Sequence, residues 1–274
     1  MATTSSTTRC LLVALALAAI GSVARAGADA AATVHLDALT WVELRERIAA
    51  GATIALVPIG GTEQNGPHMV LGKHNARARW LAERIAQRLG NALVAPVVAY
   101  VPEGAIDPPA AHMRWPGTLS MPGAAFESML EATALSLARA GFRDVVLLGD
   151  HGGYLGSLDH VAARVNGAKR TPPVHVHALG EYYRASSSGF DQMLRERGFS
   201  DAQIGRHAGL SDTALALAVD EALVRPAAMA AAPVAGNGVQ GDPRRATAEL
   251  GRAGLELIVE ASVAAIRQRT RRGL

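Results

Sequence analysis

Carboxylates and imidazoles gather in two short segments of the sequence, and each segment follows an apolar run that is typical of a buried strand. The first segment, residues 58–75, is rich in glycine and carries four side chains that can bind a metal or a substrate: Glu63, Asn65, His68 and His74. The second, residues 149–153, carries Asp150 and His151 between glycines. Ligands in open α/β sheets gather just beyond the carboxyl ends of the strands. The pattern therefore predicts a metal site built from two strand ends.

His151 directly follows the aliphatic run 145–148, and the glycines beside it leave space around the imidazole for a metal or a substrate. Asp150 has two interpretations: it can orient His151 as an acceptor, or it can cap the following helix. The structural alternative for Glu63 is a helix cap or a surface carboxylate. The nearby imidazoles of His68 and His74 favour a metal ligand instead.

A third group, His207 and Asp212, lies at the start of a predicted helix, residues 212–223. An acidic residue in the first turn of a helix has a sufficient structural explanation. A histidine close to a carboxylate can also act as a general base or acid, and the spacing alone leaves both interpretations open. His112 precedes residues 114–118, a segment that we expect to form a loop over the site.

Strands and helices alternate along the rest of the chain. The expected strands are 53–59, 93–98, 145–148 and 174–178, and the expected helices are 44–50, 76–89, a long helix ending at Gly141, 155–165, 212–223 and 247–267. Strands separated by helices of this length imply βαβ units. We therefore predict an α/β fold, a three-layer α/β/α sandwich with a mostly parallel central sheet. Residues 226–241, rich in Ala, Pro and Gly, are expected to form a long loop on the side of the active site.

Residues 1–26 have the pattern of a signal peptide, in which Arg9 precedes the apolar stretch 10–20 and small residues surround a cleavage site after Ala26. The stretch is short for a membrane span, which needs about 20 residues; an uncleaved anchor is the alternative. We expect a periplasmic or secreted protein with a single domain, residues 27–274. Its only cysteine, Cys10, would leave with the leader, so any metal would be held by His, Asp, Glu or Asn.

The composition argues against a nucleic-acid partner. Without the leader, 25 basic residues face 24 acidic ones, and the only basic cluster is the arginine-rich C-terminus. Aromatic residues make up 4% of the chain, so stacking platforms are scarce. No P-loop or dinucleotide fingerprint is present. After signal cleavage we expect no membrane partner either.

The motifs resemble, in order, those of the creatininase (creatinine amidohydrolase) family. That family's pattern is Gly-Ser/Thr-Glu-Gln-His-Gly-Pro-His-Leu-Pro-Leu after a strand, with a closing Asp. Here residues 61–71 read Gly-Thr-Glu-Gln-Asn-Gly-Pro-His-Met-Val-Leu, and His74 stands in place of the Asp. Further matches are His112 with 116–118, then 141–143, 151–153, 207–209 and 238–243. The resemblance covers essentially the whole chain after the leader, and it implies the family's fold and a homo-oligomer.

The resemblance also implies a hydrolase with two divalent ions, often zinc or manganese, and it makes Glu63 and His151 ligands of one ion. His74 takes the position of the carboxylate that bridges both ions, and Asn65 that of a histidine of the second ion. A neutral imidazole has one free lone pair and cannot bridge two cations, and asparagine is a poor replacement for a nitrogen donor to zinc. We therefore expect one ion, zinc or manganese, held by Glu63, His74 and His151 with an open position for water.

The expected function is cleavage of a C–N bond in a small amide, cyclic amide or peptide by a metal-activated water. His207 would shuttle the proton to the leaving nitrogen, with Asp212 at the position of a family carboxylate. Leu210 stands where the family often has an acidic residue, and Tyr154 stands where it often has Asn. Both changes suggest a different pocket, so creatinine is not the expected substrate. Two alternatives remain: a non-catalytic periplasmic binding protein, favoured by the missing bridging carboxylate, and a structural role without a metal.

Overall fold

A four-stranded parallel sheet forms the centre of the computed structural model, which describes residues 33–232 and 236–271. The expected signal peptide lies outside the described residues. The strand order is β2–β1–β3–β4, and the strands are β1 (Ile54–Ile59), β2 (Ala92–Val94), β3 (Asp144–Gly149) and β4 (His175–Ala178). β1 and β3 pair over their full lengths, with Ile54 opposite Asp144 and Ile59 opposite Gly149. The segments that follow these two strands therefore leave the sheet at the same edge.

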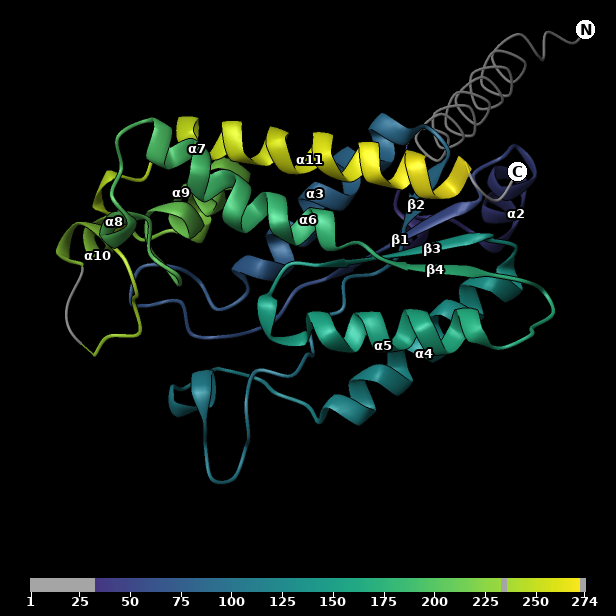
Figure 1. Ribbon diagram of the computed structural model, residues 1–274, viewed down its shortest axis with the longest axis horizontal. Coiled ribbons are helices and arrows are strands. Elements are labelled where there is room, and N and C mark those ends of the chain that lie inside the picture. Colours follow the sequence, from purple (N-terminus) through teal and green to yellow (C-terminus); the bar gives the residue numbers. More distant parts are fainter. Residues whose placement is uncertain (1–32, 233–235, 272–274) are drawn as a thin grey trace, which may run out of the picture.

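Helices connect the strands and cover both faces of the sheet. The α-helices are α2 (Trp41–Ala49), α3 (Lys73–Leu89), α4 (Gly123–Ala140), α5 (Leu155–Gly167), α6 (Gly180–Arg184), α7 (Phe190–Glu196), α8 (Asp201–Ile204), α9 (Leu210–Val219), α10 (Pro226–Ala231) and α11 (Ala248–Thr270). The short helical turns are η1 (Leu36–Ala38), η2 (Ala111–Arg114), η3 (Gly152–Tyr154), η4 (Ala185–Gly189, a π-turn), η5 (Glu221–Leu223) and η6 (Pro243–Arg245). In Figure 1, α3, α6 and α11 lie on one face of the sheet and α4 and α5 on the other.

The core has two halves because successive strand residues point to opposite faces of the sheet. Leu56 and Val146 belong to one buried cluster, with apolar side chains of α3, α9 and α11. Val57 and Leu147 belong to the other cluster, with side chains of α4 and α5. All residues of β1 and β3 are buried, as expected for strands covered on both faces. The predicted three-layer α/β/α sandwich is confirmed.

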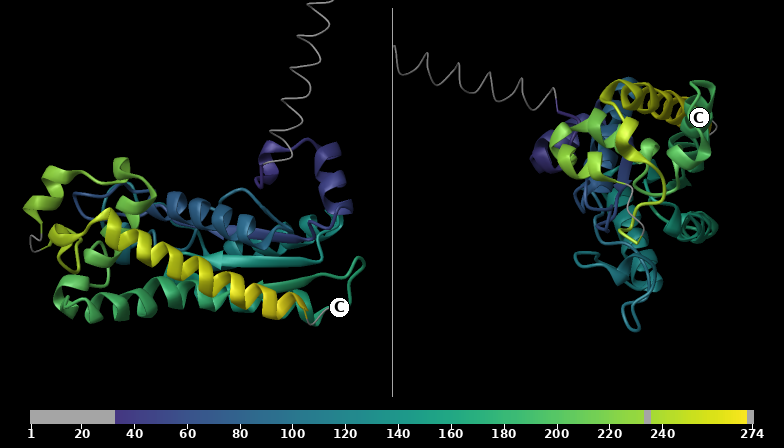
Figure 2. Two further views of the ribbon diagram at one scale, coloured as in Figure 1. Left: turned by 90° about the horizontal axis from the view of Figure 1, so that it is seen from above. Right: turned by 90° about the vertical axis from the view of Figure 1, so that its left-hand side faces the viewer.

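The long helix α11 runs along one face of the molecule (Figure 1 and the left view of Figure 2). Its N-cap is Thr247, whose hydroxyl accepts a hydrogen bond from the Leu250 N–H. Helix α4 stops at Gly141 as predicted, and this glycine adopts a left-handed conformation with φ of +115°. No helix within the described residues has the length and apolar character required to cross a membrane.

Apart from shifts of a few residues in the ends of other elements, such as α9 ending at Val219, three segments differ from the prediction. Strand β2 ends at Val94 instead of continuing to Val98, because one extra residue interrupts the regular ladder: the Ala95 N–H donates to Leu56 O, but the next donor to β1 is the Val98 N–H, to Pro58 O. The segment after β4 forms α6, η4, α7 and α8, which were not predicted. The expected loop at residues 226–241 begins with the helix α10.

Candidate metal centre

The loop after β1 is held in place by its own polar side chains. Asn65 Nδ2 donates to the carbonyl oxygens of Glu63 (2.9 Å) and Val70 (3.0 Å). His68 is fully buried, and its Nε2 lies 3.0 Å from Thr213 Oγ1 in α9. These contacts fix the loop around Glu63, so Asn65 and His68 brace the site in this structure.

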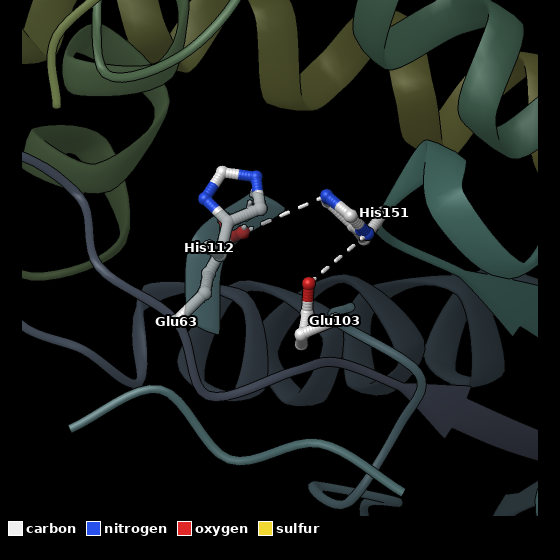
Figure 3. Close-up of side chains that lie close together, drawn as sticks. All are labelled: Glu63, Glu103, His112 and His151. Carbon is white, nitrogen blue, oxygen red and sulfur yellow. Dashed lines mark ion pairs between the residues drawn. The ribbon is translucent and has the colours of Figure 1, made fainter. Parts of the chain in front are cut away.

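Four side chains converge beyond the ends of β1 and β3: Glu63, Glu103, His112 and His151 (Figure 3). Each offers one ligand atom, and these atoms all lie within 4.8 Å of one another. Glu63 Oε2 lies 3.2 Å from His112 Nε2 and 3.6 Å from His151 Nε2. On the other side of the imidazole, His151 Nδ1 lies 3.6 Å from Glu103 Oε2. Two oxygen and two nitrogen donors form a group that suits a divalent ion.

The burial of these ligand atoms, their missing hydrogen-bond partners and the pKa values of their side chains suit a bound cation. Glu63 Oε2 and both carboxylate oxygens of Glu103 are buried, and none has a hydrogen-bond partner among the described residues. Burial, together with the neighbouring Glu63, raises the pKa of Glu103 to about 8, so a nearby positive charge is needed to keep this carboxylate ionised near pH 7. Burial also lowers the pKa of His151 to about 4, which leaves its imidazole neutral with a lone pair to offer. Buried acceptors without donors are costly, and a bound cation would satisfy them.

Gly61 makes room for the Glu103 carboxylate. Its φ is +153°, a conformation that favours glycine, and a Cβ at this position would overlap Glu103 Oε1. The loop after β1 and the segment around residue 103 can therefore approach closely enough for Glu63 and Glu103 to face one site.

His74 lies beside this group of four side chains. Its Nε2 is 2.9 Å from Glu63 Oε1, and its Nδ1 is 2.6 Å from Asp150 Oδ2. Burial and Lys73 oppose protonation of the ring, but hydrogen bonds to Asp150 and Glu63 raise its pKa overall. Both nitrogens face carboxylates, so His74 would have to give up one of these contacts to bind a metal. Its predicted role as a ligand stays a prediction.

Asp150 contacts α3 instead of orienting His151. Arg77 Nε donates to both of its oxygens, at 3.1 and 2.9 Å, and the Tyr182 hydroxyl donates to Oδ1 at 2.7 Å. Despite burial, Arg77 and His74 hold the pKa of Asp150 below its usual value. Asp150 therefore fixes the position of His74 and ties α3 to the end of β3.

Asp212 binds two cations of α3. Its Oδ2 lies 2.8 Å from Lys73 Nζ, and its Oδ1 accepts from Arg77 Nη1 at 3.1 Å. Burial opposes ionisation, yet Lys73 and Arg77 hold the pKa of Asp212 well below its usual value. Asp212 also accepts a hydrogen bond from the Ala208 N–H at 2.9 Å.

His207 faces Glu63 from the segment before α9. Its Nε2 lies 2.8 Å from the Gln64 carbonyl oxygen, and its Nδ1 lies 3.7 Å from Glu63 Oε1. Burial, together with Lys73, lowers the pKa of His207 to about 4, so the ring is neutral near pH 7. In the described part of the chain no hydrogen bond joins His207 to Asp212; the Ala208 N–H connects the two segments. The neutral ring can accept a proton.

A cavity of about 410 Å³ opens beside these residues. Its lining includes Lys73, His112, His151, His207 and Asp212. The structure thus brings the predicted residues Glu63, His151, His74, His207 and Asp212 into one region.

Sequence reasoning missed Glu103 and His112 as ligands, since His112 was expected only beside a loop over the site, and it missed Lys73 and Arg77 as charged groups of the site. Glu103 lies in a loop between β2 and α4, where neither periodicity nor a strand end marks it. Lys73 and Arg77 begin an amphipathic helix, where cations are usually exposed. The one signal for Glu103 is its place beside Gly104 in a Pro- and Gly-rich segment.

Two curated relatives share part of the chain. Creatinine amidohydrolase of Pseudomonas putida is 33% identical over 119 residues, which are 43% of this chain and 45% of that protein. The mycofactocin precursor peptide peptidase of Mycolicibacterium smegmatis is 34% identical over 110 residues, 38% of this chain and 42% of that protein. The regions that match this chain therefore cover less than half the length of each of these relatives.

Solved structures match over most of their length. A crystal structure of creatinine amidohydrolase (creatininase) aligns with a TM-score of 0.69 and 26% identity over 87% of this chain and 98% of that chain. A variant creatininase described as Zn–Zn type aligns with a TM-score of 0.67 and 27% identity over 86% of this chain and 98% of that chain. The family described as creatinine amidohydrolase matches residues 37–266. Because that match spans nearly all of the described residues, the chain belongs to the creatininase family.

Proposed function

We propose that this protein is a metal-dependent amidohydrolase that cleaves the C–N bond of a small amide, cyclic amide or peptide. The observation that carries the proposal is the group Glu63, Glu103, His112 and His151, in which Glu63 Oε2 and both Glu103 carboxylate oxygens are buried without a hydrogen-bond partner among the described residues. The names of the two curated relatives support the bond type, since creatinine amidohydrolase and a peptide peptidase both act on C–N bonds. The creatinine ring itself is not proposed as the substrate.

Glu63, Glu103, His112 and His151 would hold the ion, zinc or manganese. Such an ion supplies a water of lowered pKa and polarises a carbonyl group. His207, neutral and 3.7 Å from Glu63 Oε1 through Nδ1, would accept a proton and pass it to the leaving nitrogen. Asp212 would position the His207 segment through the Ala208 N–H. The cavity of about 410 Å³ limits the substrate to a small molecule or the end of a peptide.

We also propose that the protein is exported and that it forms a homo-oligomer. The pattern of residues 1–26 supports cleavage of a leader and a periplasmic or secreted location. Sequencing the N-terminus of the protein recovered from a periplasmic fraction tests the first point. Sedimentation of the purified protein tests whether it forms a homo-oligomer.

The central experiment measures metal content and hydrolysis together. The chain without its leader is purified without a histidine tag, its metal is measured by elemental analysis, and a panel of cyclic amides, linear amides and short peptides is assayed. Metal-dependent hydrolysis that is lost in Glu63→Ala and kept in the exposed control Glu249→Gln supports the proposal.

The same experiment tests the binding-protein alternative. A bound ion and ligand affinity that survives in His207→Ala, without hydrolysis of any compound by the wild type, would favour a binding protein. No ion after reconstitution with zinc and manganese would refute the hydrolase.

A further inference from the structure

Lys73 is a buried cation that lines the cavity. The residue is 1% exposed, and its Nζ lies 2.8 Å from Asp212 Oδ2 and 3.9 Å from Glu63 Oε1. Beyond these ion pairs, Nζ has no hydrogen-bond partner among the described residues. An ammonium has three N–H donors, and leaving them unsatisfied in a buried site is costly. Lys73 also lines the cavity, so its unpaired donors lie at the wall that a bound molecule would contact.

The two oxygens of Glu63 face different groups. Oε1 lies 2.9 Å from His74 Nε2 and 3.9 Å from Lys73 Nζ. Oε2 has no hydrogen-bond partner in the described residues and faces His112 and His151, the nitrogen donors of the candidate metal centre. One carboxylate thus lies between the metal centre and a fixed positive charge. A carboxylate in this position offsets the repulsion between two cations.

Asp212 does not by itself account for Lys73. That carboxylate already accepts hydrogen bonds from Arg77 Nη1 at 3.1 Å and from the Ala208 N–H at 2.9 Å. Lys73 adds a second positive charge beside Asp212, and its ammonium keeps N–H donors that Asp212 does not use. Lys73 lies between Asp212 and Glu63 at the wall of the cavity, so its positive charge is placed beside any molecule bound there.

We propose that Lys73 is a protein-supplied second cation of the active site, which excludes a second divalent ion and binds the substrate oxygen that gains negative charge. This role rests on the proposed function and adds a residue to it. One creatininase variant with the same fold is described as Zn–Zn type. Here a lysine ammonium would contribute a positive charge in place of a second ion, and donors aimed at a developing negative charge lower the barrier.

The test uses Zn²⁺ alone with the leaderless chain. Zinc per chain and zinc affinity, measured by competition with a chelating dye, are compared for the wild type, Lys73→Met and Lys73→Arg. The wild type should bind one Zn²⁺. Lys73→Met should bind zinc about tenfold more tightly, because it removes a positive charge near Glu63, and Lys73→Arg should match the wild type.

Arg79→Met is the matched control. Arg79 is on the same helix but 48% exposed, so removing its charge should leave zinc affinity unchanged. For any amide that the wild type hydrolyses, kcat should fall about 100-fold in Lys73→Met. Tighter zinc with slower turnover separates this role from a structural one, in which both zinc affinity and thermal stability would fall.

Two results would overturn the role of Lys73: two Zn²⁺ per wild-type chain, or unchanged or weaker zinc binding by folded Lys73→Met. If Lys73→Met does not fold, Lys73→Gln, which can donate to Asp212, replaces it in the same measurement. Failure of the proposed function is distinct, because the wild type itself would then bind no zinc.

Discussion

His74 Nδ1 lies 2.6 Å from Asp150 Oδ2, so the first turn of α3 is joined to the end of β3 by a buried hydrogen bond. Arg77 and Tyr182 bind the same carboxylate. The candidate metal centre lies directly beside this network, because His74 also contacts Glu63. The geometry of the site therefore depends on a carboxylate that is not in the group of candidate ligands.

Replacing Asp150 with Asn should destabilise the protein by about 3–5 kcal/mol, because Arg77 and His74 would lose a buried partner. Urea unfolding at pH 7 measures this loss, and Asp159→Asn, an exposed change in α5, should stay within about 0.5 kcal/mol of the wild type. The pKa of Asp150 is lowered in the folded state. Its stabilisation is therefore present above the unfolded-state value of about 4 and is lost as the pH falls through the folded value. An equal difference between variant and wild type at neutral and strongly acidic pH would contradict this.

Glu103 should make the stability of the metal-free protein depend on pH. Its pKa is about 8 when folded and about 4.3 when unfolded, so the folded state binds more protons between these values. Stability of the metal-free protein should therefore fall as the pH rises from about 4.3 to 8. Thermal melts across this range should show the decline in the wild type and a smaller one in Glu103→Gln. Excess zinc should stabilise the wild type more than Glu103→Gln, and equal stabilisation would exclude Glu103 as a ligand.

Gly61→Ala should weaken zinc binding by about tenfold or more, because the new Cβ would displace Glu103 and because φ at this position is +153°. We expect it to lower stability by about 1–3 kcal/mol. Gly156→Ala is the matched control: a Cβ there would meet no atom within 4 Å, and alanine in α5 should keep zinc affinity and raise stability slightly. Similar zinc affinity in both variants would show that Glu103 does not need the space at Gly61.

His207→Ala should lower kcat by about 100-fold or more while the zinc content stays unchanged, because a proton acceptor is removed and no candidate ligand is lost. The pKa of His207 is about 4, so the neutral ring is present throughout the neutral range. We expect kcat/KM of the wild type to be independent of His207 ionisation from about pH 5 to 8. A fall in zinc content would instead identify His207 as a ligand.

The sequence predicted those parts of the fold and of the site that follow from patterns within one segment of the chain. The glycine-rich ends of β1 and β3 marked Glu63 and His151, because apolar runs and the residues after them are visible in the sequence. Glu103 and His112 reach the same point only through the path of the loop between β2 and α4, and no periodic pattern encodes that path. The segment 180–204 was not predicted as helical because Gly and Ser are weak helix formers there. Burial of Tyr182 and Phe190 in the core stabilises it nevertheless.

The pairing of β1 with β3 joins residues that are far apart in the chain, since Ile54 lies opposite Asp144. The four candidate ligands span residues 63 to 151 and meet only after this pairing has formed. Closing so long a loop is slow, and the candidate centre does not exist before it closes. A metal that binds only the folded site should therefore mainly slow unfolding. The parallel sheet must form without the help of the ion.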